Sequence, residues 1–154
     1  MERYEALGGL LKRVGNFDNR SLETRVIFQK TVYFLQVFGL NFGYKFGYYI
    51  YGPYSTDLAK EGYLIEKIFD GLSPVQFTNR LNEEKFNIFQ KFIASYAGDS
   101  KWLEAAASMH TLKKLSPKIT KEELIQTIRN KQKYLDNEHF CNSIYDALVV
   151  ANLI

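Results

Sequence analysis

The sequence has few of the residues with which proteins build cross-links and metal sites. It contains one cysteine, Cys141, and two histidines, His110 and His139. A single cysteine cannot form an intramolecular disulfide, which agrees with a reducing compartment. On a helix, His139 and Cys141 would not share a face, so they do not form a zinc motif. We therefore expect no metal site and no cofactor, and we interpret His110 as a hydrogen-bonded core histidine.

Long apolar runs are also missing. The longest wholly apolar segment spans five residues, 147–151, whereas a membrane-spanning helix needs about 20. The first five residues lack the basic-then-apolar layout of a signal peptide. We therefore expect a cytoplasmic protein without a membrane segment.

The chain as a whole has little net charge, but positive charge is concentrated in one segment. The formal net charge is +3, which by itself is too small to indicate nucleic-acid binding. Residues 113–133, here called the basic stretch, carry seven basic and two acidic side chains. Three explanations stay open: a solvated helix face, an acidic protein partner, or nucleic acid. The candidate nucleic-acid contacts are Lys113, Lys114, Lys118, Lys131 and Lys133.

Catalytic motifs are not found either. Glycines recur between Gly39 and Gly52, but the Gly-Lys-Ser/Thr ending of a Walker loop and the βαβ setting of a dinucleotide fold are missing. Adjacent carboxylates occur at 83–84 and 122–123, at predicted helix starts, where they favour the helix dipole. We therefore predict no catalytic residues and no enzyme activity.

Apolar and aromatic residues, in contrast, are plentiful. Hydrophobic residues make up 46% of the 154-residue chain and aromatic residues 16%. A chain of this length buries roughly 70% of the surface that it exposes when unfolded, which is enough for a core without disulfides or metals. We expect one compact domain over residues 1–154.

Apolar periodicity predicts about seven helices. The segment 21–38 is apolar on nearly every side, so it should be the buried central helix, with Phe28, Val32 and Leu35 deep in the core. Short connections predict a C-terminal helical bundle over residues 82–154. The expected helices cover about residues 1–14, 21–38, 55–69, 82–97, 100–115, 120–135 and 136 to the last residues.

The pattern changes after the central helix. Residues 42–48 alternate aromatic with small or polar side chains, which is typical of a strand. The β-prone run continues through residue 51, and Gly52-Pro53 is expected to be the closing turn. Either one bent strand or a hairpin of two short strands fits. The predicted fold is therefore mainly α, with one small antiparallel β-sheet or hairpin in a single compact α+β domain.

This aromatic strand is the strongest candidate for a functional surface. Because alternate side chains point to opposite faces of a strand, we expect Tyr44 and Tyr48 on the packed face and Tyr49 and Tyr51 on an exposed one. Exposed tyrosines anchor protein partners and can also stack on bases. The predicted partner-binding residues are Tyr49, Tyr51, Tyr54 and Lys45.

A resemblance to a known family lies in the same region. Residues 29–35 read Gln-Lys-Thr-Val-Tyr-Phe-Leu, and Phe46, then Tyr51-Gly52-Pro53, then Leu58 follow. In this order they resemble the Panacea (SocA-like antitoxin) domain, in which a Gln-Lys-x-x-Tyr-Phe-like helix precedes a short strand ending in Tyr-Gly-Pro. The turn at 51–55 is also similar to one in uncharacterised YwgA-like proteins.

The resemblance implies a small, mainly helical, non-enzymatic domain that neutralises a toxin or serves as an adaptor in its degradation. The leading hypothesis is therefore a protein-interaction module, antitoxin-like or associated with phage defence or mobile elements, whose protein partner could be a toxin. The alternative is a nucleic-acid-binding transcriptional regulator that uses the basic stretch.

Overall fold

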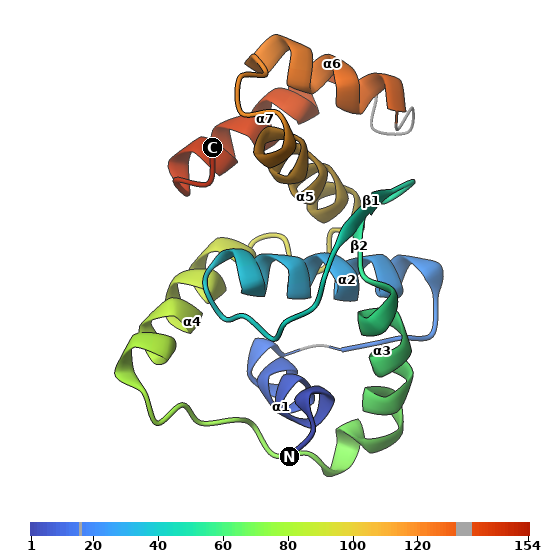
Figure 1. Cartoon of the computed structure of the whole chain (residues 1–154), viewed down its shortest axis with the longest axis vertical. Coiled ribbons are helices and arrows are strands. Elements are labelled where there is room, and N and C mark those ends of the chain that lie inside the picture. The colour runs from blue at the N-terminus through green and yellow to red at the C-terminus, as the bar shows by residue number, and fades with distance from the viewer. Residues whose placement is uncertain (16, 132–136) are drawn as a thin grey trace.

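The computed structural model describes residues 1–15, 17–131 and 137–154. In this part of the chain, seven helices and one two-stranded antiparallel sheet form a compact, mainly helical domain, as the sequence predicted (Figure 1). The helices are α1 (Arg3–Val14), α2 (Leu22–Val37), α3 (Thr56–Ile68), α4 (Arg80–Ile93), α5 (Ser100–Leu115), α6 (Lys121–Lys131) and α7 (Glu138–Val150). The strands are β1 (Gly47–Tyr49) and β2 (Gly52–Tyr54), and a 3₁₀ turn, η1 (Phe69–Gly71), follows α3.

Helix α2 is the centre of the fold. The Ser21 hydroxyl caps its first turn by accepting a hydrogen bond from the Thr24 N–H. Its apolar residues reach almost all the way round the helix, so it contacts α3, α4, α5 and β2. Phe28, Val32 and Leu35 are buried, which confirms the prediction.

The other helices lie on two sides of α2. Figure 1 shows α5, α6 and α7 together at one end of the molecule and α1, α3 and α4 at the other. Helix α5 connects the first of these groups to the centre of the fold, because it contacts α2 and β2 as well as α6 and α7. Every residue from Trp102 to His110 is consequently buried.

The small sheet begins and turns at other residues than predicted. Tyr48 pairs with Pro53, and the chain turns at Ile50-Tyr51 rather than at Gly52-Pro53. The hairpin is therefore the correct alternative, but the predicted turn residues belong to its second strand. Figure 1 places this hairpin where the two groups of helices meet.

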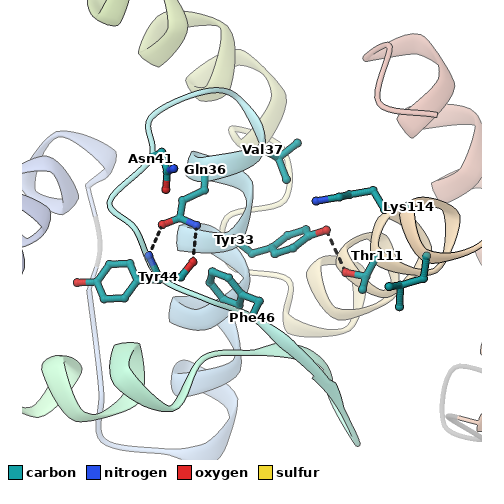
Figure 2. Close-up of a pocket in the computed structure, with 9 residues that line it drawn as sticks. Tyr33, Gln36, Val37, Asn41, Tyr44, Phe46, Thr111 and Lys114 are labelled. Carbon is teal, nitrogen blue, oxygen red and sulfur yellow. Dashed lines mark hydrogen bonds between the residues drawn. The ribbon is translucent and has the colours of Figure 1, made fainter.

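Residues 42–46 do not form the predicted strand, because a side chain occupies the place of a partner strand. The Gln36 amide donates to the Tyr44 carbonyl at 3.0 Å and accepts from the Tyr44 N–H (Figure 2). It also accepts from the N–H of Phe42. These main-chain groups are therefore satisfied without a neighbouring strand. In residues 42–46 the aromatic alternation reflects packing against helices rather than sheet pairing, because Phe46 packs on Tyr33 of α2 and the Tyr44 hydroxyl donates to Glu61 of α3.

Candidate binding surface

The hairpin is clamped to α2 by the first two residues of the segment 29–35. The Gln29 amide donates to the Ser55 carbonyl at 2.9 Å and accepts from the Ser55 N–H at 3.0 Å. The Lys30 ammonium donates to the Pro53 carbonyl at 2.7 Å. Ser55 in turn caps α3, since its hydroxyl accepts from the Leu58 N–H. The hairpin is thus bonded to two helices at its base.

Lys30 is the unusual member of this clamp, because it is a charged residue and is only 1% exposed. Burial lowers its pKa to about 8, against an opposing effect of the nearby Glu104 carboxylate. A buried charge is tolerated only when it is paired or hydrogen-bonded. The Pro53 carbonyl supplies that bond, so Lys30 ties the hairpin to the core.

The other face of the hairpin is pressed against α5. Gly52 has φ of +88°, and a Cβ atom at this position would lie 2.4 Å from the Ser108 hydroxyl oxygen. Beside it, the Lys131 ammonium lies 3.4 Å from the centre of the Tyr48 ring, a cation–π contact from the end of α6. Tyr44 and Tyr48 both lie toward the interior, as predicted.

The tip of the hairpin, in contrast, is exposed. Its three consecutive residues Tyr49, Ile50 and Tyr51 are 52%, 72% and 38% exposed. The Tyr49 ring packs edge-on against Tyr54, with 5.5 Å between ring centres. The prediction that Tyr49 and Tyr51 are exposed is confirmed, whereas Ile50, the most exposed of the three, was missed.

Next to the tip is a cavity of about 170 Å³, here called the hairpin pocket. It lies between the start of α2, the hairpin and α3, and Tyr51 and Tyr54 form part of its wall. Most of the lining is apolar or aromatic, from Leu22, Val26, Phe28, Tyr51, Tyr54 and Tyr63. Leu22 and Tyr63 are exposed at this site. The exposed apolar surface therefore extends from the tip onto two helices.

The remaining predicted residues are spread over several places. Lys45 is exposed in the segment before β1. Lys113 donates to the Ile119 carbonyl at 2.9 Å, and Lys118 is exposed between α5 and α6. Lys114 lines a second cavity, and Lys131 covers Tyr48. Lys133 lies outside the described residues. Of the basic side chains that can be placed, Lys113, Lys114 and Lys131 thus each have a different local environment, and Lys45 and Lys118 are exposed.

That second cavity, about 340 Å³, lies between α2, the following loop and the end of α5 (Figure 2). Thr111 donates to the Tyr33 hydroxyl at 3.0 Å, and the Tyr33 hydroxyl is hydrogen-bonded to Nδ1 of His110 at 2.6 Å. Burial raises the pKa of Tyr33 to about 12. Burial, followed by the charge of Lys114, lowers the pKa of His110 to about 4. Both groups are neutral at pH 7, and His110 is the hydrogen-bonded core histidine that the sequence predicted.

This network predicts a loss of stability in acid. Unfolded His110 binds a proton near pH 6.5 but folded His110 only near pH 4, so the unfolding free energy falls as the pH falls between these values. We expect a decrease of about 3 kcal/mol, measured by urea unfolding at several pH values. The variant His110→Asn, whose side-chain amide can take the place of Nδ1 in the bond to Tyr33, should lose this part of the curve. The control is the same substitution at the exposed His139, which should leave the curve as it is. An unchanged curve in His110→Asn would contradict the assignment.

Within the described ranges, no three histidine, cysteine, aspartate or glutamate side chains are grouped so that they could hold a metal ion. No described helix has the length and apolar character needed to cross a membrane. The chain matches no protein-family model, no curated protein and no solved structure. The resemblance seen in residues 20–60 therefore stays a prediction.

Proposed function

We propose that the protein is a non-enzymatic interaction module, antitoxin-like in its role, that binds a protein partner through the hairpin tip. The observation that carries the proposal is the exposure of three consecutive large apolar side chains, Tyr49, Ile50 and Tyr51. Such runs are unfavourable on a free surface unless they have a function. Tyrosine also contributes a large contact area with few torsions to immobilise.

The clamp at the base of the hairpin supports the proposal. Gln29 and Lys30 bond to main-chain atoms on the second strand and just after it, and Gly52 packs on α5. The tip is therefore presented on a rigid base, which reduces the entropy lost when a partner binds. The resemblance to the antitoxin domain lies in the same region of the chain, and it also supports a protein partner.

The test is a double substitution at the tip, Tyr49→Ser with Ile50→Ser. Both side chains are exposed, so the melting temperature should change little. Binding to a partner should weaken by about 30-fold or more, as at other interface hot spots. The partner is first captured from the source organism with the immobilised native chain, and its affinity is then measured with both purified proteins.

The matched control is Ile88→Ser on α4, because Ile88 is 58% exposed and lies away from the hairpin. It should retain full affinity. A partner that binds the double variant as tightly as the native chain would contradict the proposal. Binding of the purified chain to duplex DNA that is lost on Lys118→Glu would favour the nucleic-acid alternative.

A further inference from the structure

We infer that the hairpin pocket receives one aromatic side chain of the protein partner, together with an adjacent carboxylate that accepts a hydrogen bond from Asn19. This inference rests on the proposed function and names the chemistry that the partner must present. Size, an unused donor and the charge of the lining each point to this occupant.

The size of the pocket fits one ring. Its volume is about 170 Å³, and an apolar protein cavity of about 150 Å³ binds benzene. The walls include Phe28, Tyr54 and Tyr63, and aromatic rings favour edge-on or offset contacts with another ring. A single aromatic side chain therefore fills the pocket.

The unused donor is the side-chain amide of Asn19. This residue is 4% exposed and lines the pocket, and its Nδ2 atom has no hydrogen-bond partner among the described residues. The Arg25 guanidinium holds the Asn19 main chain in place by donating to its carbonyl at 3.2 Å. A buried donor without a partner is unfavourable, so turning this amide toward an oxygen acceptor on the occupant would relieve a cost that the free protein bears.

The charge of the lining selects the kind of acceptor. Arg25 and Lys30 both line the pocket, and no aspartate or glutamate is among the lining residues of the described chain. Only one nitrogen of Arg25 is engaged by a described residue, through the bond to Asn19. A carboxylate is therefore favoured over a neutral carbonyl, and an ammonium group is disfavoured.

The experiment uses three small probes that share a benzene ring and differ in the attached group. They are phenylacetate, neutral phenylacetamide and 2-phenylethylammonium. Each is titrated into the full ¹⁵N-labelled chain, and binding is followed by ¹H–¹⁵N correlation spectra. Phenylacetate should bind most tightly, with a Kd on the order of 1 mM. It should shift the side-chain amide signals of Asn19 and the main-chain signals of Leu22 and Tyr63.

Two variants separate the donor from the cavity. Asn19→Asp keeps the shape of the side chain but replaces its donor by an acceptor, so phenylacetate should bind at least about tenfold more weakly while 2-phenylethylammonium should not. Ala59→Phe places a ring in the pocket and should abolish binding of all three probes. Leu81→Ala, an exposed change on α4, is the control. The dispersion of the same spectra reports whether each variant is folded.

The outcomes distinguish this inference from the proposed function. Equal affinity for all three probes, no binding of phenylacetate, or binding that Asn19→Asp leaves unchanged would each overturn the inference. In each of those cases, weaker partner binding by the double variant Tyr49→Ser with Ile50→Ser would still support the proposed function. A partner whose affinity is unaffected by Ala59→Phe would overturn the inference even if phenylacetate binds, because the pocket would then be a small-molecule site.

Discussion

Replacing Leu35 by alanine is expected to lower the free energy of unfolding by about 2–5 kcal/mol. Leu35 is fully buried in α2, the helix that contacts α3, α4, α5 and β2. Because rigid elements surround α2, the cavity left by the lost methyl groups should collapse only partly. Urea unfolding followed by circular dichroism and by the fluorescence of the single tryptophan, Trp102, measures the loss.

The control for this prediction lies on the same helix. Leu22, in the first turn of α2, is 52% exposed, so Leu22→Ala should change stability by less than about 0.5 kcal/mol. A loss below about 1 kcal/mol for Leu35→Ala would contradict the central position of α2.

Replacing Gly52 by alanine should destabilise the protein by about 2–5 kcal/mol, for two separable reasons. At φ of +88° an L-residue with a Cβ is strained, by about 1–2 kcal/mol. The added methyl group would also lie 2.4 Å from the Ser108 hydroxyl oxygen, and such overpacking typically costs about 1–3 kcal/mol. Thermal and urea unfolding measure the sum.

Two further variants divide this effect. Gly15 has φ of +107° with no atom within 4 Å of the added Cβ, so Gly15→Ala measures the conformational part alone. Adding Ser108→Ala to Gly52→Ala removes the clashing oxygen and should recover the steric part, as in a double-mutant cycle. Equal losses in Gly15→Ala and Gly52→Ala would mean that the hairpin can move away from α5 without cost.

Helices were predictable because their signals are local. The apolar residues of α2 recur within a few positions of one another, and the bounds of α5, Ser100–Leu115, agree with the expected 100–115. At the start of α6, Thr120 and Glu123 form a reciprocal cap. Such features depend on side chains three or four residues apart, which a sequence displays directly.

The position of the hairpin turn depends on contacts that a local pattern does not contain. Gln36 supplies the bonds that keep residues 42–46 out of a sheet. Lys30 fixes Pro53 from 23 residues away. The aromatic alternation continues through both regions, so it could not mark where the strand begins. A lysine on the apolar side of a mostly apolar helix was the available signal, because a buried ammonium must find an acceptor.

The candidate surface was predictable only in part. The alternation placed Tyr49 and Tyr51 on an exposed face, and both are exposed. The hairpin pocket was missed, because Leu22, Asn19 and Tyr63 come together only when the start of α2, the hairpin and α3 pack against each other. Asn19 and Leu22 are near neighbours in the sequence, but nothing in the spacing relates them to Tyr63 on α3.

The clamp leaves the side chains at the tip of the hairpin free to vary. Gln29 and Lys30 both bond to main-chain atoms, at Ser55 and Pro53, and to no side chain of the hairpin. The side chains at 49–51 can therefore be exchanged while every bond of the clamp is kept. Under the proposed function, specificity and stability are therefore encoded by different residues, and the tip can evolve toward a new target at little cost to folding.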